Sequence, residues 1–320
     1  MSVYYIIMSK SSSFDNILYP IDSKEYLNKS ERNIQRVNNK LDDYLKAPNE
    51  EHIHDIRTSI RRLRASYQSL PKSIRNKKKI KKFVAKSKEL FSINSKVRDY
   101  DIIFEMLSEY MSSEKAPKHE QQQLSQSSRA ISNLLKSLET VRNRELTESK
   151  TLAVELRKLS VPKLGDNNIN ISEKKLKKRF NNVVGKLANT IEKNYPVVLS
   201  SSKRLIELHE MRKDCKKLRY LLELLPIDRD VKNQDKDKVS QLIDELEKVQ
   251  DMLGTIHDYD TTIAYIKKHV ENHSKYRSLN NIVKYVYEDR RKKFEQFIEY
   301  CRVDLSNSKD NLFVNIMNIN

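Results

Sequence analysis

Two segments, HDIRTSIRRLR at residues 54–64 and HEMRKDCKKLRY at residues 209–220, repeat one arrangement of basic residues 155 positions apart. At about 100° per residue of α-helix, the four basic positions of each copy fall within an arc of about 80°. Mainly aliphatic residues occupy the neighbouring arc, as expected for a helix with one buried face. The sequence therefore predicts two helices, each with a basic ladder beside its buried face. The ladder positions are His54, Arg57, Arg61 and Arg64 in the first copy and His209, Arg212, Lys216 and Arg219 in the second.

A second element is repeated in the same order. VRDYDIIFEML at residues 97–107 aligns with IHDYDTTIAYI at residues 256–266, and both contain Asp-Tyr-Asp. The offset here is 159 positions instead of 155, which indicates an insertion of about four residues between ladder and element in the second copy. Two segments that match in both order and spacing indicate an internal duplication.

The composition favours helices. The chain of 320 residues contains only three glycines and seven prolines, whereas sheets with tight turns require glycine at positive φ. We therefore predict an all-α fold of two tandem, pseudo-symmetric four-helix bundles with long helices. The expected divisions are an N-terminal segment (1–22), a first bundle (23–160), a linker (161–172) that contains Pro162 and Gly165, a second bundle (173–305) and a C-terminal tail (306–320).

Periodicity and proline positions predict the individual helices. Pro48, Pro71, Pro196 and Pro226 are expected to end helices. Residues 1–20 are expected to be irregular or to form short strands. The predicted helices cover about 23–46, 49–70, 72–91, 95–111 and 118–159 in the first half, and 173–194, 201–225, 235–253, 258–272 and 275–305 in the second.

The charge of the chain indicates an acidic partner. The formal net charge is +18, and residues 51–82 contain eleven Lys or Arg against two acidic residues. Nucleic acid, polyphosphate or an anionic lipid surface would satisfy this excess. The apolar run near the N-terminus is too short for a signal peptide or a membrane span, and two cysteines do not make a disulfide framework. We therefore expect a soluble, cytoplasmic protein with a buried Cys215.

The repeated motifs resemble those of the CHAD family, the conserved histidine α-helical domain. The first copy matches the family pattern fully, at His54, Arg57, Arg61, Arg62 and Arg64 and then at Arg98, Asp99 and Asp101. The second copy matches with substitutions, at His209, Arg212, Lys216, Lys217, Arg219 and Tyr220 and then at Gly254, Asp258 and Asp260, with His257 in place of Arg98.

The resemblance spans about residues 23–305. It implies two four-helix bundles around a basic cavity or surface, binding of inorganic polyphosphate without catalysis, and association with polyphosphate granules. A sulfate or phosphate ion would be expected to occupy the same site.

The ladder residues suit a polyvalent anion on chemical grounds as well. Arginine offers planar bidentate donors to phosphate oxygens, and lysine acts as a point charge. Lys79, Lys82 and Lys86 could guide the anion towards the ladders. The predicted polyphosphate-binding residues are His54, Arg57, Arg61, Arg62, Arg64, Lys79, Lys82, Lys86, Arg98, His209, Arg212, Lys216, Lys217 and Arg219.

The alternative for these cations is structural pairing with acids on neighbouring helices, with Asp99, Asp101, Asp258 and Asp260 as the candidates. Arg62 and Lys217 fall near 80° on the helical wheel, away from the ladder, and are expected to contribute less.

Two further classes of function stay open. A helical nucleic-acid-binding protein would use the same charge, although the ladder face has few aromatic residues for base stacking. An enzyme acting on polyphosphate or a nucleoside triphosphate would need acidic residues holding Mg²⁺ beside the cations. The sequence contains no glycine-rich phosphate loop and no nucleophile elbow. We predict no catalytic centre, no metal site and no cofactor.

Overall fold

The computed structural model describes residues 22–112, 121–164, 172–225, 234–272 and 278–307. These residues form helices and connections without a β-strand, which confirms the all-α fold. None of the helices among them is both long and apolar enough to cross a membrane. The helices are α1 (Ser23–Lys46), α2 (Glu50–Ser69), α3 (Lys72–Arg75), α4 (Lys78–Ser112), α5 (Gln121–Arg157), α6 (Glu173–Ser200), α7 (Leu205–Leu222), α8 (Gln234–Asn272) and α9 (Leu279–Asn307).

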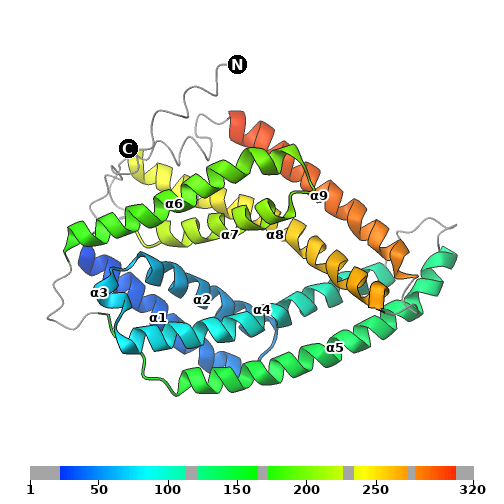
Figure 1. Ribbon diagram of the computed structural model, residues 1–320, viewed down its shortest axis with the longest axis horizontal. Helices are drawn as coiled ribbons and strands as arrows, with labels where there is room; N and C mark the ends of the chain where they lie inside the picture. Colours follow the sequence, from blue (N-terminus) through cyan, green and yellow to red (C-terminus); the bar gives the residue numbers. More distant parts are fainter. Residues whose placement is uncertain (1–21, 113–120, 165–171, 226–233, 273–277, 308–320) are drawn as a thin grey trace.

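The repeat seen in the sequence is also present in the order of helices. Shifting α2 by 155 residues places it on α7, and shifting α4 by 159 residues places it within α8. In Figure 1 the first half, α1 to α5, lies below the second half, α6 to α9, with α2 and α7 side by side between them. The two ladder helices therefore meet at the junction of the halves.

The two halves share their apolar cores. The larger core joins Tyr26 and Leu63 of the first half to Phe180 and Met211 of the second, and it includes the fully buried Cys215. A smaller core joins the C-terminal part of α4 and the N-terminal part of α5 to α8 and α9. The expected domain limits at 23–160 and 173–305 therefore mark the repeat, and whether each half is a separate bundle stays a prediction.

The starts of α1 and α2 follow from capping residues. The Asp22 carboxylate accepts hydrogen bonds from the backbone N–H groups of Lys24 and Glu25. The Asn49 side chain accepts one from the N–H of His52, two residues before the first ladder position. Such caps satisfy donors that have no partner within the helix. They fix where α2 begins and hence which way its ladder faces.

The prediction of separate helices at 72–91 and 95–111 was wrong. A short α3 is followed by one continuous α4, which passes through Asn94 and Ser95. The Ser95 hydroxyl donates to the Phe91 carbonyl at 2.7 Å, and the buried Asn94 side chain accepts hydrogen bonds from Tyr44 and Ser149. Because these polar groups find partners without leaving the helix, they do not end it.

Two other helix breaks were also predicted wrongly. The α8 helix runs through Gly254, where a break was expected between residues 253 and 258, because a single glycine costs a helix only about 1 kcal/mol. The α6 helix includes Pro196 and continues to Ser200. Proline inside a helix removes one backbone hydrogen bond and costs about 3 kcal/mol, which the burial of Val198 beyond it helps to offset.

Parts of three expected segments lie outside the described residues. These are the N-terminal segment up to residue 21, the linker residues 165–171 and the tail from residue 308.

Candidate functional site

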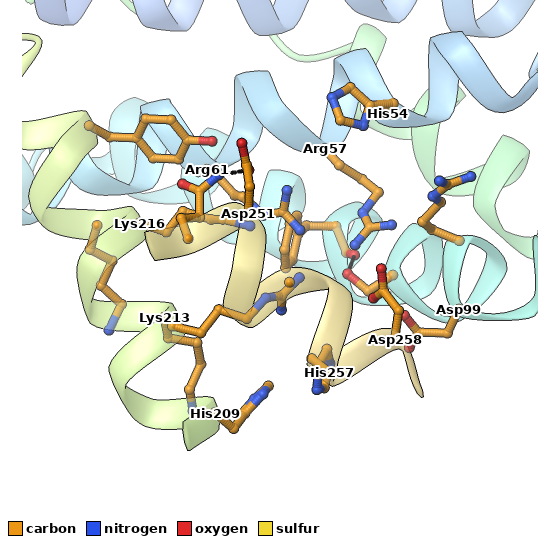
Figure 2. Close-up of a pocket in the computed structure, with 18 of the residues that line it drawn as sticks. His54, Arg57, Arg61, Asp99, His209, Lys213, Lys216, Asp251, His257 and Asp258 are labelled. Carbon is orange, nitrogen blue, oxygen red and sulfur yellow. Dashed lines mark hydrogen bonds between the residues drawn. The ribbon is translucent and has the colours of Figure 1, made fainter. Parts of the chain in front are cut away.

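A cavity of about 620 Å³ lies between the two halves of the chain. Its walls come from α2 and α4 of the first half and from α7 and α8 of the second (Figure 2). Both ladders line it, so helices 155 residues apart in the sequence contribute cations to one site. The predicted residues on its walls are His54, Arg57, Arg61, Arg64, Arg98, His209, Arg212, Lys216 and Lys217.

The central cations of the cavity have no acidic partner. Within the described part of the chain, no carboxylate lies within ion-pair distance of Arg57, Arg61, Arg64, Arg212 or Lys216. Arg57 is only 8% exposed. The Nε–H groups of Arg57 and of its repeat equivalent Arg212 are buried and lack a hydrogen-bond acceptor. A buried, unpaired charge is costly, and these donors can be satisfied by an anion that enters the cavity.

The pKa values of the cations reflect this crowding. Burial, together with the charge of Arg61, lowers the pKa of Arg57 to about 9. Burial and the charges of Arg61 and Arg212 lower the pKa of Lys216 to about 6. In both cases the surroundings disfavour the charged form, because desolvation and like charges act together. A bound anion would raise the pKa values of Arg57 and Lys216, because its negative charge favours their charged forms.

Phe91 on α4 provides a surface on which three arginines of the first ladder gather. The guanidinium carbons of Arg57, Arg61 and Arg64 lie 5.9, 5.3 and 5.3 Å from the centre of its ring. The negative face of an aromatic ring attracts cations, so the ring partly offsets the repulsion between these like charges. Sequence reasoning missed Phe91, although it stands one helical heptad before Arg98 and so shares its face of α4.

The two aspartates of each Asp-x-Asp element have different roles. Asp101 accepts from Arg142 of α5, and Asp260 accepts from Arg290 of α9 at 2.7 Å. These second aspartates therefore pair with arginines outside the ladders. Structural pairing of the ladder cations with these two residues, the alternative considered above, does not occur.

Asp99 and Asp258, the first aspartates, line the cavity without forming an ion pair there. Burial raises the pKa of Asp99 to about 6, and the charge of Arg57 partly opposes this shift. Burial also raises the pKa of Asp258, against the charge of Arg212. Because their pKa values are raised, Asp99 and Asp258 neutralise only part of the positive charge in the cavity, and an excess of positive charge remains.

The second half contributes groups that titrate. His257 replaces Arg98 of the first half, and its ring lies 4.6 Å from that of His209. Burial and the neighbouring Arg212 lower the pKa of His257 to about 3. Burial and the charge of Lys213 lower the pKa of His209. The substitution noticed in the sequence therefore replaces a permanent cation by a neutral ring.

Several predicted residues lie away from the cavity. The Arg62 Nε lies 3.0 Å from Glu223, and Arg219 pairs with Glu223 and Glu247. Lys86 pairs with Glu89 and Glu155 on the far side of α4. Five predicted residues do not line the cavity, and their role in binding stays a prediction. They are Arg62, Lys79, Lys82, Lys86 and Arg219.

Three further cavity residues either form an ion pair or were missed in the sequence. Lys217 lines the cavity but also lies 3.0 Å from Asp214, and Arg98 pairs with Glu50. Lys213, missed in the sequence, also lines the cavity. It falls about 40° from His209 on the helical wheel, so the wheel alone could have found it.

Within the described residues, no group of three or more His, Cys, Asp or Glu side chains could hold a metal ion. The cations of the cavity would also repel one. The arrangement is suited to holding the oxygen atoms of an anion.

Fold and site together define an all-helical protein with an internal repeat and a shared cavity of unpaired cations. The chain belongs to the CHAD domain family, whose model matches residues 31–267. Among solved structures, the chain is similar to the CHAD domain from the plant Ricinus communis, with 11% identity, a TM-score of 0.47, and coverage of 93% of this chain and 92% of that one. A search of curated proteins found no match.

Proposed function

We propose that this protein binds inorganic polyphosphate in the cavity between its halves and does not turn it over. The observation that favours this function most is the set of buried and half-buried ladder cations that form no ion pair, above all Arg57 and Arg212, whose buried Nε–H groups lack an acceptor. Membership of the CHAD family supports polyphosphate as the anion, because the resemblance of the motifs implies that ligand.

The dimensions and chemistry of the ladders fit a linear polyanion. Each ladder spans ten residues, or about 15 Å of helix, which is long enough for several consecutive phosphates. The planar guanidinium groups of the arginines would hold phosphate oxygens through charge-assisted hydrogen bonds. Because such binding releases counterions, its affinity should fall steeply with salt concentration.

Nucleic acid is the less favoured ligand. Phe91 and Tyr220 are the only Phe, Tyr or Trp side chains among the cavity-lining residues. The Phe91 ring is already surrounded by three guanidinium groups. Binding of single strands usually depends on rings free to stack with bases.

A competition experiment tests this ranking. A labelled oligonucleotide bound to the protein is titrated with unlabelled long-chain polyphosphate at equal phosphate concentration, and fluorescence anisotropy reports displacement. We expect polyphosphate to displace the oligonucleotide. Failure to do so, with the oligonucleotide displacing polyphosphate instead, would reverse the assignment.

The absence of catalysis is tested separately. Incubation of the protein with polyphosphate or a nucleoside triphosphate and Mg²⁺ should release no phosphate above the background rate. Steady phosphate release that is lost in an Arg57→Glu, Arg212→Glu double variant would instead identify an enzyme. We further propose that the protein resides in the cytoplasm on polyphosphate granules, which co-localisation of a fluorescent fusion with stained granules would test.

A further inference from the structure

The last positions of the two ladders differ in how far their charge is neutralised. Arg219, the last position of the second ladder, pairs with Glu223 and Glu247. The repeat offsets of 155 and 159 place Gln68 and Lys88 at the corresponding positions of the first half. The last position of the first ladder, Arg64, therefore lacks both carboxylates.

This difference leaves the α2 side of the cavity cationic where the two ladders finish. Arg64 and Gln68 line the cavity, whereas Arg219, Glu223 and Glu247 do not. At this end the α7 side is neutralised by ion pairs, and Arg64 on the α2 side is not. An anionic chain that fills the cavity is therefore expected to continue past Arg64 and Gln68.

The α4 helix leads away from the cavity at this end with a row of lysines. Phe91 and Ser95 line the cavity, and Lys88, Lys81 and Lys77 precede them along the chain. At about 100° per residue, these five side chains fall within an arc of about 80°. Lys81 and Lys88 are exposed, and within the described part of the chain none of the three lysines forms an ion pair.

Residues of α3 and α6 add cations at this end of the cavity. Arg179 of α6 donates its Nε–H to the carbonyl of Gln68 at 3.0 Å, and the neighbouring Tyr67 hydroxyl donates to the carbonyl of Arg75. Burial lowers the pKa of Arg179, and the charge of Arg75 adds to this effect. The Arg75 Nε–H is buried without an acceptor. Lys175 is exposed one helical turn before Arg179.

We call these six residues, contributed by α3, α4 and α6 together with Lys77 just before α4, the exit strip. Within the described residues, none of them forms an ion pair. Several unneutralised cations around one end of a cavity attract a polyanion and raise its local concentration. The exit strip consists of Arg75, Lys77, Lys81, Lys88, Lys175 and Arg179.

The opposite direction along α4 is acidic. A separate groove between α4 and α5 is lined by Glu105 and Glu139, and also by Glu50 and Asp101, which pair with Arg98 and Arg142. A polyanion that left the cavity at this end would meet carboxylates, and like charges repel it. The charge distribution therefore favours a single exit.

We propose that a polyphosphate chain longer than the cavity leaves it past Arg64 and Gln68 and lies along the exit strip. This inference rests on the proposed function. The fourteen residues of chain between Lys77 and Phe91 add about 21 Å to the binding path, which exceeds the ladder itself. Short polyphosphates then bind in the cavity alone, and long ones bind to both surfaces.

The experiment compares two charge-matched variants. The Lys81→Glu, Lys88→Glu variant reverses two charges of the exit strip. The Lys150→Glu, Lys158→Glu variant reverses two exposed charges, one within α5 and one directly after it, that belong to neither the cavity nor the exit strip. Affinities for tripolyphosphate and for long-chain polyphosphate are measured by isothermal titration calorimetry at several salt concentrations.

We expect the exit-strip variant to bind long-chain polyphosphate at least about tenfold more weakly than the native protein. Its slope of log affinity against log salt should become shallower by about one for each phosphate that the strip no longer neutralises. Its affinity for tripolyphosphate should stay within about twofold, because the cavity is intact. The Lys150→Glu, Lys158→Glu variant should bind either ligand less than about threefold more weakly than the native protein.

Two results would overturn the exit strip while leaving the cavity assignment standing. One is native long-chain affinity in the exit-strip variant, and the other is an equal decrease of long-chain affinity in both variants. Failure of the native protein to bind either polyphosphate would refute the proposed function itself. The two failures are thus distinguishable.

Discussion

Arg61 of α2 and Lys216 of α7 occupy equivalent positions of the two repeats, and they line the same cavity. After burial, the charge of Arg61 is the largest contribution that lowers the pKa of Lys216 to about 6. Two cations are thus held near each other without an acidic partner. A fold keeps such a pair when a function requires it, because neutral residues would pack there at lower cost.

Reversing the central arginines should abolish polyphosphate binding. In the Arg57→Glu, Arg212→Glu double variant, two buried cations become carboxylates that repel phosphate. We expect at least about a hundredfold loss of affinity, since charged groups in buried sites contribute several kcal/mol. Calorimetric titration with polyphosphate measures it, and circular dichroism verifies that the variant is folded.

The control for this prediction is Arg62→Glu. Arg62 lies outside the cavity and pairs with Glu223, so its reversal should weaken binding far less. Equal losses of affinity for the double variant and for Arg62→Glu would mean that overall charge, and not the cavity, determines the affinity.

Polyphosphate binding near pH 7 should take up protons. A lysine whose pKa is about 6 is mostly neutral at pH 7, and phosphate beside Lys216 would raise that pKa and so recruit a proton. The affinity should therefore rise as the pH falls from 8 towards 6. Titrations in two buffers with different ionisation enthalpies measure the number of protons taken up.

A Lys216→Arg variant separates this residue from the others. Arginine is charged throughout this pH range, so the variant should take up fewer protons than the native protein. The remaining uptake would come from His54, His209, His257, Asp99 and Asp258. Identical observed enthalpies in the two buffers for the native protein would contradict the prediction.

Loss of Arg290 should destabilise the fold. Its side chain is 3% exposed and bonds Asp260, the second aspartate of the repeated element. Arg290→Ala would leave that partly buried carboxylate without its partner, at a cost of about 3 kcal/mol. Urea unfolding measures the decrease in the free energy of unfolding. Arg291→Ala serves as the control, because this neighbour is 56% exposed and solvent screens its ion pairs, so its loss should change the free energy of unfolding far less.

Gly254 should tolerate alanine but not a large side chain. A Cβ at this helical position would lie 3.7 Å from Arg212 Nε, which is an ordinary van der Waals distance. Gly254→Ala should therefore stabilise α8 by about 0.5–1 kcal/mol and preserve binding. Gly254→Phe should project into the cavity beside Arg212 and reduce affinity. Thermal unfolding and titration measure the two effects, and unchanged binding by the Phe variant would place the ligand elsewhere.

Helical periodicity was sufficient to find most of the cavity cations. His54, Arg57, Arg61 and Arg64 share one face of α2 because the pitch of a helix is fixed, whatever it packs against. Lys79 and Lys82 were selected for their charge alone, without helical periodicity. They do not line the cavity, and their role in binding stays a prediction.

The breaks assigned within α4, α6 and α8 failed for a different reason. A Pro, Gly or polar residue inside a helix lowers the stability of that helix by a few kcal/mol at most. Tertiary packing offsets that cost where the side chains find partners, as Asn94 does with Tyr44 and Ser149.

The sequence by itself determined the helical class, the repeat and the two ladders, because composition and periodicity depend only on neighbours along the chain. Which cations remained unpaired depended on interactions between distant segments. Arg219 meets Glu247 only after α7 packs on α8, and Arg64 meets Phe91 only after α2 packs on α4. The charge of each side chain follows from its residue type, whereas its neutralisation depends on which opposite charges lie near it in the folded protein.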